Sequence, residues 1–393
     1  MEYRPYFLSR AWVSAGHEVS IVASDKSHLR IRQPCLGREN KRVEIIDGIQ
    51  YAWLKTYPYT GNGVGRAINM CSFVHCLYRH ANALSEEFRP EVVIASSTYP
   101  MDIWPARRIA ETCNAKLVFE VHDLWPLTPI ELGGMSRLHP FIMLLQAAES
   151  YAYRHADSVV SILPKVHEYV AHKGLAPDKL HIIPNGVDPE GWSSTIPYLA
   201  AEVKSRLVDI TRAGHAIVGY AGNHGISNSL DAFLQTAQVM RNEQVSFVLV
   251  GDGPEKDELR RYASSEQLSN VHFIDPVPKE QIPALLQAFD IAFIGWRRHS
   301  LYRFGIAPNK LIDYMMAARP ILHAVEAGND LVTEAGCGLT VAPESPEAAA
   351  TGLRALLNLS DSERRAMGNR GREYVLKNLM YPILSERFLA ACR

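Results

Sequence analysis

Short apolar runs rich in β-branched residues alternate with helical stretches along most of the chain. Continuous apolar runs are typical of strands that are buried on both faces, and the helical stretches between them supply the crossovers that parallel strands require. The alternation therefore predicts an α/β fold built on parallel sheets. In the first half the expected strands are Glu18–Ser24, Glu91–Ser97, Lys116–Val121, Ser158–Leu163 and Leu180–Pro184.

The second half repeats this theme, so we expect two α/β domains. The length of 393 residues agrees with two or three domains of roughly 150 residues. Asp188–Gly214 contains prolines and glycines but no clear strand, and it separates the halves. We predict domains at 1–190 and 191–379, and a last helix, 380–393, that packs back on the first. The expected strands are Ala216–Ala221, Ser246–Val250, Val271–Ile274, Ile291–Ile294, Pro320–Ala324 and Gly338–Val341.

The amino-terminal end of the pattern is unusual. A helix-like segment, Tyr6–Ser14, precedes the first expected strand. Open α/β domains of this class start with a central strand and a Gly-containing turn. We therefore expect the first strand of the amino-terminal domain to be missing, which would leave a gap in the core or an unpaired edge. The alternative is an unusual sheet that never had this strand.

Charge and cysteine content exclude several classes of protein. The chain has 41 Lys and Arg against 42 Asp and Glu, a formal net charge of -1, so it lacks the basic excess of a nucleic-acid binder. None of its six cysteines forms a Cys-x-x-Cys pair, which favours buried, reduced thiols over a zinc site. The start shows no secretion signal and no apolar run is long enough to span a bilayer, so we expect a cytoplasmic protein.

The segment Leu301–Pro320 contains a candidate anion site. Pro308 suits the first position of a helix, which places Ala307 at the N-cap, where it cannot satisfy the free N–H groups. An uncapped helix start with Lys310 in its first turn attracts anions. Asp313 lies three residues further along the same face, so a phosphate at the tip and a ribose hydroxyl beyond it would suit the pair. The alternative is a local ion pair between Lys310 and Asp313.

Two glycine-rich loops follow neighbouring strands of the second domain. The first contains Gly222, Asn223 and His224, and the second contains Gly251 and Gly253. Glycine permits positive φ angles and close approach of the backbone to a ligand, and ligands of open α/β sheets gather at the carboxyl ends of strands. The spacing is not that of the dinucleotide fingerprint, so tight strand-to-helix turns are the alternative.

The first domain carries a polar pair at the end of a strand. His122 and Asp123 follow Lys116–Val121, where His122 can hydrogen-bond a sugar hydroxyl or leaving group; the alternative is that Asp123 caps a turn. No Asp-x-Asp occurs in the chain, so we expect no metal site, and the charge of a leaving diphosphate would be met by N–H groups and Lys or Arg.

Two further segments bear on contact with a membrane surface. Lys26–Arg42 is rich in basic residues, which suits anionic lipid headgroups or an acceptor diphosphate, and a solvated loop is the alternative. Leu138–Ala148 presents an apolar face that suits either a membrane surface or another helix. Peripheral contact with the inner membrane surface therefore stays open at this stage.

Three motifs resemble glycosyltransferase family 4, of GT-B fold. They are Ile-Pro-Asn-Gly-Val-Asp at Ile183–Asp188, Val-Gly-Asp-Gly-Pro at Val250–Pro254, and the Phe304–Pro320 segment. The resemblance covers essentially the whole chain and is strongest to the bacterial O-antigen and exopolysaccharide subgroup, including N-acetyl-L-fucosamine transferases. It implies two facing Rossmann-like domains, a nucleotide-sugar held mainly by the second, and retaining transfer without a metal or other cofactor.

The resemblance also implies roles for residues. Asp313 takes the place of the ribose-binding second acid of the family's paired-glutamate motif, whereas the first acid aligns near Gly305. Backbone N–H groups of Gly305, Ile306 and Ala307 would face the donor sugar and diphosphate. Asn223 and His224 stand where the family usually places a diphosphate-clamping Arg and Lys. Lys310 and Arg303 would then supply the charge, and His122 matches a first-domain histidine that contacts the donor sugar.

These residues form the expected site. His122 and Lys310 are the expected catalytic residues. The expected nucleotide-sugar-binding residues are Gly222, Asn223, His224, Gly251, Gly253, Arg303, Gly305, Ile306, Ala307, Asn309 and Asp313.

The expected activity is that of a retaining, metal-independent hexosyl- or N-acetylhexosaminyl-transferase. It would move a sugar from a nucleoside diphosphate, expected to be UDP, to a polysaccharide or a lipid-linked saccharide acceptor. Two alternatives remain: a UDP-sugar 2-epimerase of the same fold, and a non-catalytic protein that binds sugar nucleotides.

Overall fold

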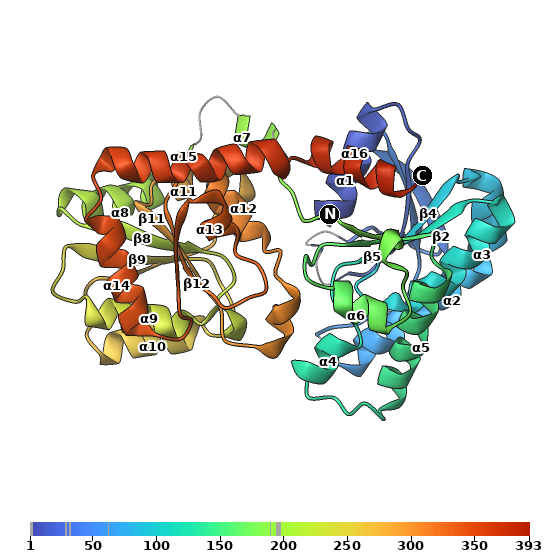
Figure 1. Ribbon diagram of the computed structural model, residues 1–393, viewed down its shortest axis with the longest axis horizontal. Helices are drawn as coiled ribbons and strands as arrows, with labels where there is room; N and C mark the ends of the chain where they lie inside the picture. Colours follow the sequence, from blue (N-terminus) through green and yellow to red (C-terminus); the bar gives the residue numbers. More distant parts are fainter. Residues whose placement is uncertain (1–2, 28–29, 31–32, 62, 189, 194–197) are drawn as a thin grey trace. The chain divides into compact units, whose positions relative to one another are not determined.

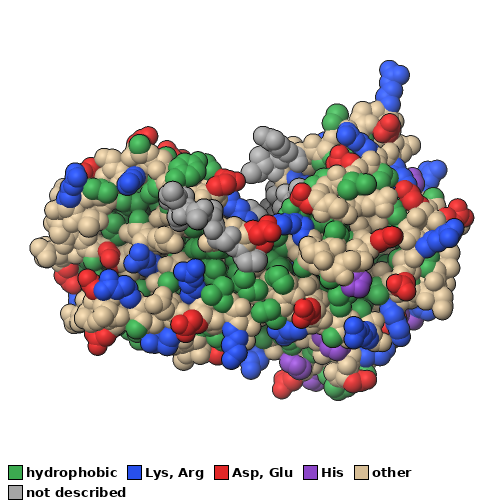
Figure 2. Space-filling model, turned by 90° about the horizontal axis from the view of Figure 1, so that it is seen from above, with side chains coloured by type: hydrophobic (Ala, Val, Ile, Leu, Met, Phe, Trp, Pro, Cys, Tyr) green, Lys and Arg blue, Asp and Glu red, His purple; other side chains and the backbone are tan. Residues whose placement is uncertain are grey.

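The computed structural model describes residues 3–27, 30, 33–61, 63–188, 190–193 and 198–393 (Figure 1). The chain divides into two compact units. Unit 1 comprises Met1–Asn185 and Tyr381–Arg393, and unit 2 comprises Gly186–Met380. On the face shown in Figure 2, basic and acidic side chains are interspersed on both units, as expected for a net charge near zero.

Unit 2 is built on one parallel sheet of six strands in the order β10-β9-β8-β11-β12-β13. Every predicted strand of this half is present, with ends within one residue of those predicted. The order reverses direction at β8, so the carboxyl end of β8 lies at the switch point where open sheets bind ligands. The strands are β8 (Ala216–Ala221), β9 (Val245–Val250), β10 (Val271–Ile274), β11 (Ile291–Gly295), β12 (Ile321–Ala324) and β13 (Gly338–Val341).

Helices connect these strands and pack two hydrophobic clusters against the sheet. The largest fully buried side chains include Tyr220, Phe233 and Phe247, so the sheet interior is fully enclosed. The helices are α7 (Glu190–Ser193), α8 (Ala201–Arg212), α9 (Leu230–Val239), α10 (Lys256–Ser265), α11 (Ile282–Gln287), α12 (Asn309–Met316), α13 (Leu331–Ala335), α14 (Pro346–Leu357) and α15 (Asp361–Asn378).

Unit 1 has two separate sheets instead of one. In the first, β1 pairs in parallel with β3, and β3 forms an antiparallel hairpin with β2 across an Asp47-Gly48 turn with φ angles of 51° and 79°. The second is a parallel sheet in the order β4-β5-β6-β7. The strands are β1 (Ser20–Ser24), β2 (Lys41–Ile46), β3 (Ile49–Leu54), β4 (Val92–Ala95), β5 (Lys116–Val121), β6 (Ser158–Ser161) and β7 (Leu180–Ile182).

The separation of the two sheets agrees with the expected absence of a central strand. Among the described residues, no strand pairs with β1 on one side and β4 on the other. The helices of unit 1 are α1 (Tyr3–Ser14), α2 (Val64–Phe88), α3 (Ile103–Cys113), α4 (Leu127–Glu131), α5 (Pro140–His155), α6 (His167–His172) and α16 (Tyr381–Ala391). No helix in the described part of the chain combines the length and apolarity needed to cross a membrane.

The last helix of the chain, α16, belongs to unit 1. Leu384 and Phe388 are fully buried in one hydrophobic cluster with Leu8 and Trp12 of α1. The Trp12 indole donates a hydrogen bond to the Ser385 carbonyl at 3.1 Å. The segment that precedes α16 is held in unit 2, where the Val187 N–H donates to the Leu379 carbonyl at 2.9 Å.

Candidate functional site

The amino end of α12 lies at the carboxyl edge of the unit 2 sheet and has no side-chain cap. Pro308 is the N-cap, with φ -75° and ψ 125°, so the helix begins at Asn309. The prediction that Pro308 is the first helical residue is wrong by one position, because its ψ angle is extended. In the described part of the chain the N–H groups of Asn309 and Lys310 have no acceptor. The positive end of the helix therefore remains available to an anion.

The Lys310 ammonium group points back over this helix start. It donates to the Tyr220 hydroxyl at 2.8 Å and to Asn228 Oδ1 at 2.6 Å, and lies 4.7 Å from the centre of the Tyr220 ring. No described carboxylate lies within ion-pair distance of it, so the predicted alternative of a Lys310–Asp313 ion pair is wrong. Burial lowers the Lys310 pKa to about 8. A cation without a counter-ion and partly removed from water favours a bound anion.

The glycine loops after β8 and β9 pack against each other beside Lys310. A Cβ atom on Gly251, at φ 142°, would lie 2.0 Å from the Gly222 carbonyl oxygen, and one on Gly222 would lie 3.4 Å from Lys310 Nζ. The Gly222 N–H donates to the Val250 carbonyl at 2.9 Å. At Gly253 a Cβ atom would lie 2.3 Å from Asn223 Oδ1. These glycines therefore permit the contact between the loops and keep the space beside Lys310 open.

The side chains of Asn223 and His224, in the loop after β8, differ in their exposure to solvent. The Asn223 side chain is exposed, and its carbonyl accepts a hydrogen bond from the Tyr220 hydroxyl at 2.7 Å. His224 is fully buried, neither ring nitrogen has a hydrogen-bond partner in the part of the chain that the structure describes, and burial lowers its pKa to about 4. The His224 N–H donates to the Asp252 carbonyl at 2.8 Å. The His224 ring is therefore neutral and packs inside the protein under the loop, rather than facing a ligand.

The segment before α12 uses most of its backbone donors internally. Gly305, at φ 91°, donates its N–H to the Tyr302 carbonyl at 2.9 Å. The Asn329 amide accepts from the Ile306 N–H at 2.7 Å and donates to the Ile306 carbonyl at 3.1 Å. The expected donation from Gly305 and Ile306 to a ligand is therefore wrong for this structure, and among the described residues the N–H groups of Asn309 and Lys310 are the ones in this segment that lack an acceptor. Ala307 is half-buried between these two sets of groups.

Asn329 was missed by sequence reasoning, although it lies in a Gly-Asn-Asp turn that follows the predicted strand Pro320–Ala324. This turn is a recognisable loop signal at the same sheet edge. Arg303, which was predicted, is exposed in a 3-10 helix, and its guanidinium lies 4.3 Å from the Phe304 ring centre. It donates to the Ser300 carbonyl at 2.6 Å.

Asp313 lies one turn into α12 and is withdrawn from water. Burial raises its pKa to about 6, while the Lys279 ammonium and a hydrogen bond from Trp192 act in the opposite direction. Burial in turn lowers the pKa of Lys279, against the attraction of Asp313 and Asp188. Lys279 and Trp192 were not predicted, because no local pattern links them to Asp313. The arrangement holds a carboxylate that titrates near neutral pH.

In unit 1, His122 is held by a buried carboxylate. Its Nε2 lies 3.0 Å from Ser96 Oγ and 3.2 Å from Glu120 Oε2. Arg4 Nε donates to Glu120 Oε1 at 2.8 Å. Burial raises the Glu120 pKa, but Arg4 and His122 outweigh it and hold that pKa well below its usual range. The carboxylate therefore orients the His122 ring at the carboxyl end of β5.

Asp123 has the capping role that was the alternative for this pair. Its carboxylate accepts from the Leu124 N–H at 2.8 Å and from Thr128 Oγ1 at 2.7 Å. Among the described residues, no group of three or more His, Cys, Asp or Glu side chains is arranged to hold a metal ion. The basic stretch predicted at Lys26–Arg42 includes positions 28, 29, 31 and 32, which lie outside the described residues.

Both halves of the chain match known protein families. Residues 2–186 match the family described as Glycosyl transferase 4-like domain, and residues 215–359 match Glycosyl transferases group 1. The probable glycosyltransferase WbjE of Pseudomonas aeruginosa is 24% identical over 79% of this chain and 76% of its own. The lipopolysaccharide glucosyltransferase WaaG of Escherichia coli is 25% identical over 77% of each chain.

Solved structures share the same architecture. Anabaena HepE in complex with UDP and glucose superposes with a TM-score of 0.62 at 15% identity, over 88% of this chain and 86% of that one. At this identity the likeness establishes the fold, which is GT-B. Together with the matches to both halves, it shows that the chain is a glycosyltransferase of GT-B fold, with a glycosyl transferase 4-like domain followed by a glycosyl transferases group 1 domain.

Proposed function

We propose that the chain transfers a hexosyl or N-acetylhexosaminyl group from a UDP-sugar to a saccharide or lipid-linked saccharide acceptor, with retention of configuration and without a metal ion. Unit 2 binds the donor and unit 1 the acceptor. The observation that carries the proposal is the Lys310 ammonium, which has no counter-ion among the described residues and lies beside an uncapped helix start. Two similar proteins support the choice of donor and acceptor: HepE was solved in complex with UDP and glucose, and WaaG is named a lipopolysaccharide glucosyltransferase.

The diphosphate is the group best suited to the start of α12. The N–H groups of Asn309 and Lys310 and the Lys310 ammonium supply donors and positive charge at one place. These donors are fixed before the reaction and meet the charge that develops as the diphosphate leaves. Arg303 and Asn223 are exposed near the same segments and add polar contacts, and the Gly222, Gly251 and Gly253 backbone leaves room for the ligand.

The nucleoside is assigned to the region of Asp313. An ionised carboxylate accepts hydrogen bonds from vicinal ribose hydroxyls, and Lys279 with Trp192 holds the Asp313 carboxylate in place. His122 is assigned to a hydrogen bond with a sugar hydroxyl, because Glu120 and Ser96 orient its ring. The chemistry of the O-antigen and exopolysaccharide subgroup, including N-acetyl-L-fucosamine transfer, remains part of this proposal.

The proposed step needs no protein nucleophile. The bond between the sugar C1 and the diphosphate oxygen breaks, and the acceptor oxygen forms a new bond to C1 on the same face. The proton of the acceptor hydroxyl passes to the departing phosphate oxygen, so charge and atoms balance. Lys310 and the α12 N–H groups stabilise the negative charge on that oxygen.

The first test replaces Lys310 by Met and measures UDP binding by calorimetry. A hydrogen bond to a charged group contributes about 1.5–3 kcal/mol, so we expect the Kd for UDP to rise by about 10- to 150-fold. Lys204→Met, on the exposed face of α8, is the matched control because it removes the same charge elsewhere in unit 2. An increase below about threefold for Lys310→Met would show that the assigned phosphate role is wrong.

Activity is tested on the same proteins. UDP, GDP and ADP are first compared by thermal shift, because a ligand that binds only the folded state raises its stability. Transfer with the preferred sugar nucleotide should persist after treatment with EDTA, and proton NMR of the product should show the anomeric configuration of the donor. Formation of an isomeric sugar nucleotide without acceptor would instead identify an epimerase.

Peripheral contact with a membrane surface is a separate part of the proposal. Leu138 and Met143 in and before α5 are 82% and 56% exposed, so the predicted apolar face is only partly used for packing. Leu145 and Ala148 of the same helix are fully buried. The exposed side chains of Leu138 and Met143 can therefore contact the lipid of a lipid-linked acceptor at a membrane surface.

A further inference from the structure

The Lys310 ammonium is held by two neutral side chains. It donates to the Tyr220 hydroxyl at 2.8 Å and to Asn228 Oδ1 at 2.6 Å. Tyr220 is fully buried near the carboxyl end of β8, and Asn228 is 8% exposed at the end of the 3-10 helix Ile226–Asn228. Both partners come from β8 and the segment that follows it, whereas Lys310 comes from α12, so the contact joins two separate parts of the site.

The Tyr220 hydroxyl is oriented to accept from Lys310. It donates its one proton to the Asn223 carbonyl at 2.7 Å, and an ammonium group has donors only. Burial raises the Tyr220 pKa well above its ordinary value, so the hydroxyl stays neutral. The ring centre lies 4.7 Å from Lys310 Nζ, a distance at which an aromatic face attracts a cation. Tyr220 therefore presents lone pairs and a ring face to the ammonium, but no negative charge.

The Asn228 amide is oriented by the same backbone carbonyl. Its Nδ2 donates to the Asn223 carbonyl at 3.0 Å and lies 3.5 Å from the Gly225 carbonyl oxygen. Because both carbonyls are acceptors, Nδ2 faces them and Oδ1 faces Lys310. A flipped amide would place its N–H groups against the ammonium. The Asn223 carbonyl thus fixes both acceptors of Lys310.

The ammonium keeps one donor for a ligand. In the part of the chain that the structure describes, two of its three N–H groups have acceptors. A Cβ atom on Gly222 would lie 3.4 Å from Lys310 Nζ, so the glycine leaves space beside the ammonium. An anion at the start of α12 can therefore accept a hydrogen bond from Lys310 without displacing Tyr220 or Asn228.

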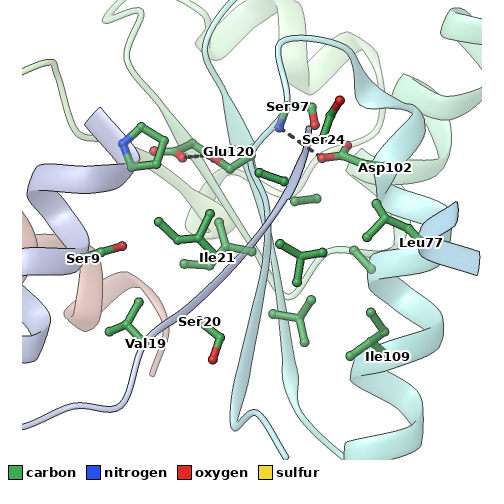
Figure 3. A pocket seen from close by; sticks show the side chains of 18 of the residues that line it. Ser9, Val19, Ser20, Ile21, Ser24, Leu77, Ser97, Asp102, Ile109 and Glu120 are labelled. Carbon is green, nitrogen blue, oxygen red and sulfur yellow. Dashed lines mark hydrogen bonds between the residues drawn. The ribbon is translucent and has the colours of Figure 1, made fainter. Parts of the chain in front are cut away.

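Buried cations elsewhere in the described chain are paired with carboxylates. Arg4 is 5% exposed and donates to Glu120, which lines a cavity of about 540 Å³ between β1 and β4 (Figure 3). Lys256 is 8% exposed, and its Nζ lies 2.7 Å from Asp275 Oδ1. Such a partner would offset the charge of Lys310, whereas neutral acceptors fix its ammonium group and leave the charge uncompensated.

We propose that Tyr220 and Asn228 are positioning residues of the donor diphosphate site, which hold the Lys310 ammonium beside the start of α12 and leave its charge available to the diphosphate. The identity of the anion rests on the proposed function, whereas the placement of the ammonium is a property of the free protein. Both acceptors favour the charged form of Lys310, so removing one should change how readily this lysine keeps its proton.

The pKa of Lys310 can be followed separately from its surroundings. Besides Tyr220, the titratable side chains on the elements around it are Asp313 and Tyr314 of α12, His224 of the loop after β8, and Asp252 and Lys256 of the loop after β9 and the start of α10. Burial lowers the pKa of His224 to about 4, raises that of Asp313 to about 6, and raises that of Tyr314 above its ordinary value. These three groups therefore titrate away from the Lys310 pKa of about 8.

Replacing Tyr220 by Phe removes only the hydroxyl. In the free full-length chain, lysines labelled with ¹³C at Cε are titrated by NMR, and the Lys310 signal is the one absent from Lys310→Met. Loss of an acceptor disfavours the ammonium, so the Lys310 midpoint should fall by about one pH unit. Tyr262→Phe is the matched control, since its hydroxyl donates to Gln238 at 2.9 Å in the same unit, and it should leave the midpoint unchanged. An unchanged midpoint in Tyr220→Phe would overturn the proposal.

UDP binding by the same proteins is measured by calorimetry at pH 6 and pH 8. A lower Lys310 midpoint removes charge mainly at pH 8, so the ratio of the Tyr220→Phe Kd to the parent Kd should be about fivefold larger at pH 8 than at pH 6. A purely structural loss would give equal ratios, and that result would overturn the positioning role. A shifted midpoint in a protein that does not bind UDP would support the placement of the ammonium and contradict the proposed function.

Asn228→Asp tests whether the partner must be neutral. The carboxylate would supply a counter-ion, so the Lys310 midpoint should rise by about one pH unit or more while the Kd for UDP at pH 7 rises at least about tenfold. Asn242→Asp, at an exposed turn before β9, is the control and should change neither value. UDP binding as tight as in the parent would overturn the proposal. Should Asn228→Asp fail to fold, the Tyr220→Phe titration decides alone.

Discussion

The two units use the same kind of fold but differ at the centre of the sheet. In unit 2 the central strands β8, β9 and β11 are buried along almost their whole length. In unit 1 the strands at the corresponding place, β1 and β4, are half-buried and face a cavity. The inner strands β5 and β6 of the four-stranded sheet are nevertheless nearly as buried as β8, β9 and β11 of unit 2.

This difference teaches that helices and the strands β5 and β6 can pack fully beside an open centre. The α1–α16 cluster and the Arg4–Glu120 pair border the cavity and remain buried. Unit 2 instead depends on close packing at its carboxyl edge, where two glycine loops touch. Substitutions in each unit should therefore differ in how strongly they lower stability and UDP binding.

The largest effect is expected for Gly251→Ala in unit 2. Its Cβ atom would lie 2.0 Å from the Gly222 carbonyl oxygen at a φ of 142°, so the two loops must separate. We expect a loss of about 4 kcal/mol in unfolding free energy, together with loss of UDP binding. Gly214→Ala is the control, since φ is 82° but nothing lies within 4 Å, and it should cost only about 1 kcal/mol. Urea unfolding measures both losses. Similar losses in unfolding free energy for the two variants would contradict the importance of the contact between the Gly222 and Gly251 loops.

The corresponding test in unit 1 is Glu120→Gln. Arg4 is 5% exposed and would be left as a buried cation without its carboxylate, so we expect a loss of about 3 kcal/mol at pH 7. The folded-state pKa of Glu120 is lowered, so its contribution is present above the ordinary pKa and is lost as pH falls below it. The difference between variant and parent should therefore shrink in strongly acidic urea titrations. A difference that grows on acidification would refute the assignment.

A smaller effect concerns the pH dependence of UDP binding. The Lys310 pKa of about 8 means that the free protein carries the ammonium below pH 8 and loses it above. Affinity for UDP should therefore be nearly constant between pH 7 and 8 and fall by up to about tenfold per pH unit above it. Calorimetry at a series of pH values measures this fall, and the Lys310→Met variant should lack it.

The smallest effect is expected for Asp313→Asn. The pKa of Asp313 is raised to about 6, so the ionised carboxylate costs folding stability, and this cost develops as pH rises from about 4 to 6. The variant should be more stable than the parent by about 1 kcal/mol at pH 7.5, with no gain at pH 4, while it binds UDP less tightly. Asp209→Asn on the surface of α8 is the control and should change neither property. An equal gain at both pH values would exclude the titration as the cause.

Much of the fold follows from local patterns in the sequence. The strand at Lys116–Val121 and those at Ala216–Ala221 and Gly338–Val341 have the predicted bounds, because continuous apolar runs fix buried parallel strands. The start of α12 is displaced by one residue from the prediction, since proline fixes φ but leaves ψ free to be extended.

The candidate site was predictable only in part. Lys310 and the glycine loops have local signals, whereas Asn329, Lys279 and Trp192 reach the site through long-range packing. The burial of His224 could not be anticipated from a loop motif, because it depends on Phe273, whose ring lies 6.5 Å away on another strand. Hydrogen bonds within the Gly305–Ile306 segment likewise depend on the Asn329 side chain, which is distant in sequence.

The membership of α16 in unit 1 has a consequence for biosynthesis. Leu384 and Phe388 are made after all of unit 2, yet they are fully buried in one cluster with Leu8 and Trp12, which are made before it. Domains generally fold as the chain emerges from the ribosome, with the amino-terminal one first. Here the apolar surface of the earlier unit is covered only once α16 has been made, so a chain stalled after unit 2 would expose that surface to chaperones and proteases.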